Sequence, residues 1–240
     1  MIAAGVVKGP AAYVLWVAAL ALEQLSPLLA PVRGRFDIQP SHFVERHGAL
    51  VIIVFGESVV DIGIGAEGHA VTVSLALSAV LGLALVAALW WAYFGIGDDE
   101  RAERAMLAAD PAARPALALA AYFFAYIPML LGVVALASGV KQAIVNPGRT
   151  LPAGPCVALF LAGSAAFRHA LRIGPLSYRL AAAAACLAAS AVGVAMSVAA
   201  EMALLTVIVV VALAAERRGA LAAGRRAASA GGSGRVVPPG

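Results

Sequence analysis

Charged side chains are scarce in this sequence. Of its 240 residues, 12% are Asp, Glu, Lys or Arg, whereas 62% are hydrophobic, and the mean hydropathy is +0.93. A soluble globular domain carries about 25% charged residues. The few charges stand in short clusters between long uncharged runs, as expected when helices must satisfy their own backbone polar groups in lipid. This scarcity excludes a soluble domain and predicts an all-α, polytopic transmembrane helical bundle.

Cysteine and lysine are almost absent as well. Cys156 and Cys186 lie in apolar segments without metal-type spacing, so neither a disulfide nor a zinc site is predicted. Lys8 and Lys141 are the only lysines. The net charge of +4 comes from basic residues dispersed between apolar runs, which argues against a nucleic-acid partner and is typical of a membrane protein.

Enzyme signatures are missing too. The sequence contains no glycine-rich phosphate loop, no nucleophile elbow and no HExxH motif. The acids within apolar runs have no evident nucleophile or metal partner. We therefore expect no catalytic activity, no cofactor and no resident metal.

Seven apolar runs account for most of the chain. A membrane-spanning helix needs about 20 apolar residues. The candidates are 10–30, 47–65, 70–96, 115–139, 155–173, 177–198 and 201–216. They predict a transmembrane domain over 1–216 with about seven spans. Residues 217–240 are rich in Ala, Gly and Arg, and this low complexity predicts a disordered basic tail.

The distribution of basic residues predicts the orientation. If the N-terminus is outside, 14 of the 17 Lys and Arg residues fall in cytoplasmic segments, and only Lys8, Lys141 and Arg149 fall outside. The tail is therefore predicted to be cytoplasmic, in a bacterial plasma (inner) membrane. An outside N-terminus without a signal peptide further suggests that an odd number of helices precedes this chain.

A short helix is predicted over 98–110, between the third and fourth apolar runs. Asp98 is expected to cap it, with further acids in the first turn, where the helix dipole favours them. Tyr93 and its aromatic neighbours predict an interfacial belt. Tyr122 and Tyr126 favour packing in the core over lining a pore.

Two acidic residues lie within the second apolar run. Glu57 and Asp61 have i,i+4 spacing and share a helix face. Glu57 lies roughly 16 Å from the predicted inner end, near the bilayer midplane, where an acid costs on the order of 2.5–3.5 kcal/mol to insert. The two acids indicate a proton or cation pathway, or a polar-solute site. The alternative is a pair of protonated acids that hold helices together by hydrogen bonds.

Neighbouring residues support this candidate site. Gly56 is expected to let a helix or a solute approach closely, and Ser58 offers a hydroxyl beside Glu57. Lys141 is predicted to pair with Asp61, because both lie near the outer ends of their helices and an intramembrane acid seeks a cation.

Glu23 in the first run is the third buried acid. Pro27 follows it and is expected to break the helix there. Polar groups beside a broken helix often line a cavity. The alternative is a side chain that snorkels to the inner interface.

Four polar residues stand at the cytoplasmic end of the second run: His42, Glu45, Arg46 and His47. His and Glu are metal ligands, but the two histidines are five residues apart and point to different helix faces. The cluster therefore favours an interfacial anchor, in which Arg46 contacts headgroups or an acid, over a metal site.

The segment HFVERHGALVIIVFGES at 42–58 resembles the signature of the bacterial low temperature requirement protein A family. In that family an H-x-x-E-R-x-G run precedes an apolar stretch that ends in G-E-S or G-E. The matching residues are His42, Glu45, Arg46, Gly48, Gly56, Glu57 and Ser58. Weaker similarity covers 21–28, 88–95 and 122–139. The resemblance implies a multi-pass membrane protein of unassigned mechanism, named for a cold-growth defect. Members usually begin with a helix of the type ELFFDLVFV, whose absence here suggests that helices are missing upstream.

These observations predict a transporter or channel for a cation, a proton or a small solute, built around Glu57, Asp61 and Glu23. A non-transporting scaffold or sensor in cold or stress adaptation is the alternative, and a membrane-embedded enzyme acting on lipid is the third. The expected partners are the lipid bilayer and a small solute or cation, and a homo-oligomer is compatible with the sequence. Convergence of the three acids on one water-accessible cavity would favour transport, whereas separate acids would favour a scaffold.

Overall fold

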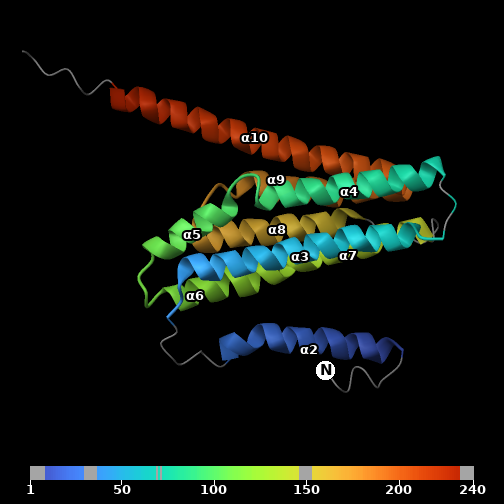
Figure 1. Cartoon of the computed structure of the whole chain (residues 1–240), viewed down its shortest axis with the longest axis horizontal. Coiled ribbons are helices and arrows are strands. Elements are labelled where there is room, and N and C mark those ends of the chain that lie inside the picture. The colour runs from blue at the N-terminus through green and yellow to red at the C-terminus, as the bar shows by residue number, and fades with distance from the viewer. Residues whose placement is uncertain (1–8, 30–36, 69, 71, 146–152, 233–240) are drawn as a thin grey trace, which may run out of the picture. The chain divides into compact units, whose positions relative to one another are not determined.

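The computed structural model describes residues 9–29, 37–68, 70, 72–145 and 153–232. They belong to two compact units, Met1–Asp37 and Ile38–Gly240. The helix described in the first unit is α2 (Pro10–Leu29), and the other helices belong to the second unit (Figure 1). Every regular element of the described residues is helical, which confirms the predicted all-α fold.

A proline lies inside α2 without ending it. Pro27 has no N–H to donate to the carbonyl of Glu23, one turn earlier. The hydroxyl of Ser26 donates to that carbonyl instead, at 2.8 Å. The predicted break beside Glu23 is therefore not formed, and the helix continues to Leu29, because a neighbouring side chain satisfies the orphaned carbonyl.

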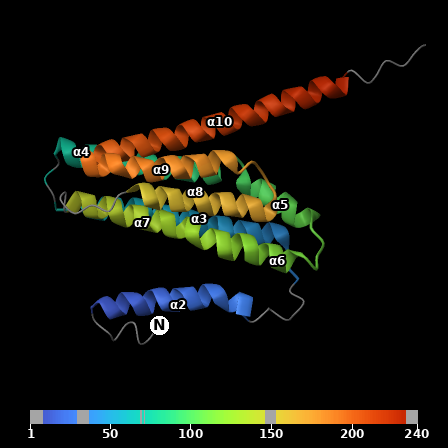
Figure 2. The same ribbon diagram turned by 180° about the vertical axis from the view of Figure 1, so that it is seen from behind.

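The second unit is a bundle of long helices with two short helices at one end (Figure 1). Its elements are α3 (Pro40–Ala66), α4 (Val73–Tyr93), α5 (Asp98–Ala108), α6 (Arg114–Ala118), the π-helix η1 (Leu119–Ala125), α7 (Tyr126–Val145), α8 (Ala153–Leu171), α9 (Ser177–Ala195) and α10 (Val198–Gly232). α7 packs against α3 and α8, α8 packs against α9, and α10 packs against α9 and α4 (Figure 1, Figure 2).

Five stretches of described helix are long and apolar enough to cross a membrane. They are Pro40–Ala66, Val73–Ala108, Arg114–Val145, Ala153–Leu171 and Val198–Arg226. α9 is apolar over Ser177–Gly193 but shorter. Large apolar side chains such as Ile53 and Val211 are 66% and 60% exposed, as expected for helices that lipid solvates. Each predicted apolar run is largely helical, and the run 115–139 is divided among α6, η1 and α7. The polytopic bundle is confirmed, while the number of seven spans stays a prediction.

α10 extends beyond the apolar run that predicted it. We expected disorder from residue 217, but the helix continues to Gly232. Ala and Arg are among the strongest helix formers, so this low-complexity stretch forms a helix. Residues 233–240 lie outside the described residues.

Glycines bring α7 and α8 into close contact. A Cβ at Gly132 of α7 would lie 2.7 Å from the carbonyl oxygen of Cys156 and from the amide nitrogen of Phe160. A Cβ at Gly163 of α8 would lie 2.7 Å from the amide nitrogen of Met129. These two spans therefore pack backbone against backbone, as small residues allow in membranes.

Candidate functional site

The predicted ion pair between α3 and α7 is formed. Lys141 Nζ donates to Asp61 Oδ1 at 2.8 Å, and the side chains of Lys141 and Asp61 are 37% and 23% exposed. Gly65, one turn further along α3, allows this approach, because a Cβ there would lie only 3.2 Å from Lys141 Cα. The pair therefore joins two apolar helices near one end of each and stays partly open.

Glu57 lies on the exposed side of α3, one turn from Asp61. It has no hydrogen-bond or ion-pair partner in the described part of the chain. No neighbouring atom lies within 4 Å of a Cβ built at Gly56, so no described helix makes the close approach predicted there. Ser58 is buried and donates to the carbonyl oxygen of Val54 at 2.8 Å, which turns its hydroxyl toward its own helix.

Glu23 belongs to the other unit, where its side chain is exposed on α2. The three predicted acids thus have different surroundings: Asp61 is paired, Glu57 is unpaired among the described residues, and Glu23 lies on a separate unit. Their convergence on one cavity stays a prediction.

The polar cluster at the start of α3 divides over two helix faces. Arg46 Nε donates to His42 Nε2 at 2.9 Å, and His42 Nδ1 lies 4.0 Å from Glu45 Oε2, all on exposed side chains. His47 turns inward, where its Nδ1 donates to the carbonyl oxygen of Phe43 at 2.8 Å. Within the described ranges, no three His, Cys, Asp or Glu side chains are grouped so that they could hold a metal ion.

His47 contacts a buried cluster of tyrosines. The Tyr126 hydroxyl donates to the carbonyl oxygen of His47 at 3.0 Å, and the Tyr93 and Tyr126 hydroxyls are hydrogen-bonded at 2.8 Å. Tyr122, in the π-helix η1, places its ring centroid 4.7 Å from that of His47. Tyr93 is 1% exposed, so the belt prediction is wrong for this residue, because α4 directs it toward α7. The predicted core packing of Tyr126 is confirmed.

A buried network of charged side chains was not predicted. It comprises Asp98 of α5, Arg168 of α8, Arg179 of α9 and Glu216 of α10, each at most 3% exposed. Arg168 donates to both carboxylate oxygens of Asp98, at 2.8 and 2.9 Å, and also to Glu216. Arg179 donates to Glu216 at 3.3 Å and to the carbonyl oxygen of Ala92 at 2.6 Å. Two guanidinium groups and two carboxylates thus balance one another.

Asp98 has a different role from the cap that we expected. The N-cap of α5 is Gly97, in the left-handed conformation with φ 71°, and it makes no side-chain cap. Asp98 follows as the first helical residue and points to Arg168, while Arg101 lies 3.2 Å from it. The predicted acidic first turn is present.

The sequence signal for this network was an arginine inside an apolar helix. In the sequence, Arg168 and Arg179 belong to the excess of basic residues that predicts a cytoplasmic side. A guanidinium that is buried needs a carboxylate, and Glu216 closes the last apolar run. The sequence shows both the arginine and the acid, but it does not indicate that they pair, since 48 positions separate Arg168 from Glu216.

Glu201 is a further buried acid, outside the network of Asp98 and Glu216. It is 1% exposed, and its Oε1 accepts from the backbone N–H of Gly154 at 2.9 Å. Gly154 stands in the first turn of α8. Because the dipole of a helix favours a negative charge at its N-terminus, Glu201 caps α8 from the neighbouring helix.

The described helices are apolar, expose large apolar side chains on their outer faces, and bury charged side chains only in contact with partners of opposite charge or with backbone groups. These features define a polytopic α-helical membrane protein. The sequence matches the family described as "Bacterial low temperature requirement A protein (LtrA)" over residues 1–215, and the chain belongs to that family. An uncharacterized protein of Rhizobium meliloti (strain 1021) is 27% identical over 144 residues, which cover 56% of this chain and 34% of that protein. The chain therefore matches about a third of the length of this curated relative. No solved structure matches the chain.

Proposed function

We propose that this chain forms part of a transport protein for protons or small cations, in which Asp61 and Lys141 respond to the ion. The observation that carries the proposal is the 2.8 Å contact between these side chains on two helices that are apolar enough to cross a membrane. Ionisable residues in such helices are costly and commonly mark ion pathways.

Exposure separates this pair from the buried network. Lys141 and Asp61 are 37% and 23% exposed, whereas Asp98 and Arg168 are both 0% exposed. The carboxylate of Asp61 is therefore open at the surface of the bundle, whereas that of Asp98 is enclosed within it. The network suits a role in fastening helices, and the open pair suits a role in binding an ion.

An ion that binds Asp61 competes with Lys141 for its carboxylate. Loss of the pair would release the end of α3 from α7, at the point where Gly65 lets the two helices touch. Glu57 is the next carboxylate along α3, about 6 Å away by helix rise. It offers a second acid to an ion that leaves Asp61 and moves toward the bilayer centre.

The test is ion flux in proteoliposomes that contain the purified protein. Asp61→Asn keeps the shape of the side chain and removes its charge, so we expect normal insertion and a loss of proton or cation flux. Glu100→Gln is the matched control, because Glu100 is an exposed acid whose nearest cation, Arg104, is 3.9 Å away. Wild-type flux in Asp61→Asn would contradict the proposal.

A charge exchange separates transport from a structural role. Asp61→Lys combined with Lys141→Asp restores the attraction but moves the carboxylate from α3 to α7. We expect thermal stability to return toward wild type while flux stays low. Recovery of both properties would assign the pair a purely structural role.

A non-transporting scaffold is the second candidate function. The network of Asp98, Arg168, Arg179 and Glu216 favours it, because the network joins four helices through buried ion pairs. In that case, proteoliposomes would show no flux of protons, sodium or potassium above that of protein-free vesicles, at acidic, neutral or basic pH.

A further inference from the structure

A groove of about 1180 Å³ runs between α4 and α10 and reaches the start of α9. Its volume exceeds the roughly 300–1,000 Å³ of most small-molecule sites. Because α4 and α10 both belong to helices long and apolar enough to cross a membrane, lipid is the molecule to which such a groove is most accessible. The groove is therefore large enough to bind an elongated ligand such as a lipid.

The two walls of the groove run in the same direction along the bundle. Its lining on α4 runs from Ala84 to Trp91, and its lining on α10 runs from Val210 to Ala223. Both helices start at the same end of the bundle (Figure 1). The lining covers about 10 Å of α4 and about 20 Å of α10, and half of the hydrocarbon core is roughly 15 Å. The groove thus has a length on the scale of one leaflet.

The chemical character of both walls changes in the same direction. Small and aliphatic residues come first: Ala84 and Ala88 on α4, and Val210, Leu213 and Ala214 on α10. Trp91 of α4 and Tyr178 of α9 follow. Trp and Tyr are enriched where a membrane meets water, so this end of the groove lies at the level of lipid headgroups.

Three arginines line the headgroup end: Arg101, Arg217 and Arg218. Arg217 and Arg218 are exposed and have no ion pair within the described ranges. The acid in the same lining, Glu216, is already bound by two buried guanidinium groups. The headgroup end therefore has positive charge available for an anion.

We infer that this groove binds one anionic phospholipid of the leaflet on the side of the α10 C-terminal end. The acyl chains lie along Ala84, Ala88 and Val210, and the phosphate contacts Arg217 and Arg218. Basic pockets between membrane helices recognise anionic headgroups in this way. The inference is independent of the proposed transport, because neither Asp61 nor Lys141 lines the groove.

The test is thermal unfolding of the full chain in a neutral detergent as lipid is added. We expect phosphatidylglycerol to raise Tm in a concentration-dependent way, because a ligand stabilises the state that binds it. Phosphatidylcholine with the same acyl chains should act much more weakly. Arg217→Gln/Arg218→Gln should weaken the apparent affinity for phosphatidylglycerol about 25-fold, since two basic contacts contribute about 2 kcal/mol and 1.4 kcal/mol is tenfold.

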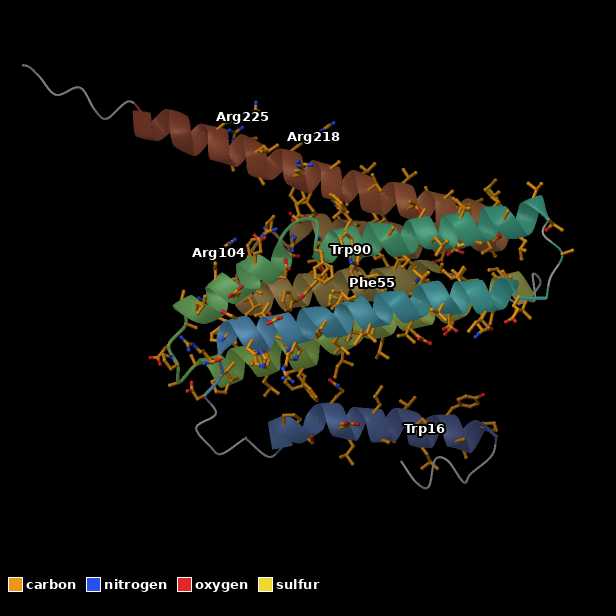
Figure 3. The ribbon with its side chains drawn as sticks, viewed as in Figure 1. Trp16, Phe55, Trp90, Arg104, Arg218 and Arg225 are labelled. Atoms are coloured by element: carbon orange, nitrogen blue, oxygen red, sulfur yellow. The ribbon has the colours of Figure 1, made fainter. Side chains whose placement is uncertain are left out.

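Arg104→Gln/Arg225→Gln is the matched control for charge. These exposed arginines project from α5 and α10 outside the groove lining (Figure 3), so their removal should leave the affinity for phosphatidylglycerol unchanged. Ala214→Trp tests the apolar part, because it fills the groove from an exposed position and keeps the arginines. It should also weaken phosphatidylglycerol binding.

Three outcomes would overturn the inference. The first is an equal Tm shift with both lipids, and the second is undiminished phosphatidylglycerol affinity in Arg217→Gln/Arg218→Gln or in Ala214→Trp. The third is the same stabilisation by inorganic phosphate alone, which would indicate an anion site that does not bind acyl chains. Flux measurements do not enter this test, so its failure is distinct from failure of the proposed transport.

Discussion

Arg168 shows how this bundle accommodates a buried charge. Its guanidinium donates to both oxygens of Asp98, to Glu216, and to the carbonyl oxygen of Pro175 at 3.3 Å. Removing a buried charge from water costs several kcal/mol, and only paired and hydrogen-bonded geometry offsets that cost. The contacts of Arg168 meet this condition.

We expect Arg168→Met to destabilise the protein by about 3–5 kcal/mol, because it leaves two buried carboxylates with one buried guanidinium, that of Arg179, and the partly exposed Arg101. Chemical unfolding in detergent measures the change in free energy. Asp98→Leu combined with Arg168→Met should recover much of the loss, since Glu216 and Arg179 then remain as a neutral pair. The control Arg104→Met alters an exposed side chain and should change stability by less than about 0.5 kcal/mol. An equally mild effect of Arg168→Met would contradict a structural role for the network.

The pairing of Asp61 with Lys141 could be predicted because few basic residues lie at the predicted outer ends of the helices. The sequence has two lysines, and both members of the pair lie near the same ends of their predicted helices. The network of Asp98 and Arg168 could not be predicted in this way, because arginines are many and most lie near the helix ends that are predicted to be cytoplasmic. The distribution of basic residues predicts which side of the membrane a segment faces. It does not predict which charged residues are buried in ion pairs.

Glu57 can be replaced without a change in packing. Since its side chain is exposed and unpaired in the described part of the chain, neither Glu57→Gln nor Glu57→Leu removes a packing contact. Both variants should keep the free energy of unfolding within about 0.5 kcal/mol of wild type. If Glu57 passes an ion onward from Asp61, both should lose flux in proteoliposomes. Normal flux in either variant would remove Glu57 from the proposed pathway.

At the scale of elements, apolar runs located every long helix but not where each one ends. Lipid requires continuous helices, so the predicted runs and the helices agree closely for α4, α8 and α9. The ends depend on local chemistry instead. The Ser26 hydroxyl carries α2 past Pro27, and the Ala- and Arg-rich stretch extends α10 to Gly232. The π-helix η1 has no comparable signal in the sequence.

The contact between α7 and α8 yields a prediction at this scale. Gly132→Val would place a Cβ 2.7 Å from the backbone of α8, so the two helices must move apart. We expect a loss of about 1–3 kcal/mol in unfolding free energy, typical of overpacking. Gly56→Val, on the open side of α3, is the matched control and should lose less than about 0.5 kcal/mol. Equal effects of the two substitutions would show that helix propensity, and not close packing, sets the loss.

At the scale of the whole molecule, the second unit has two chemically different ends. One end carries the ion network, the short helices α5 and α6, and the arginines of α10 (Figure 1, Figure 3). The opposite end carries the Asp61–Lys141 pair and the α3–α4 connection near Glu67. Arg168 and Arg179 are neutralised by buried partners. Without them, twelve of the fourteen basic residues assigned to the cytoplasm still oppose the three assigned outside.

This charge difference predicts which end faces the cytoplasm. In a background with Cys156→Ala and Cys186→Ala, Glu67→Cys should react with a membrane-impermeant maleimide added to intact cells, because its connection lies at the weakly basic end. Arg225→Cys, on the strongly basic α10 extension, should react only after the membrane is permeabilised. Both positions are exposed in the structure, so a failure to label reports the membrane barrier and not burial. Labelling of Glu67→Cys only after permeabilisation would reverse the orientation, and it would place the proposed phospholipid in the outer leaflet.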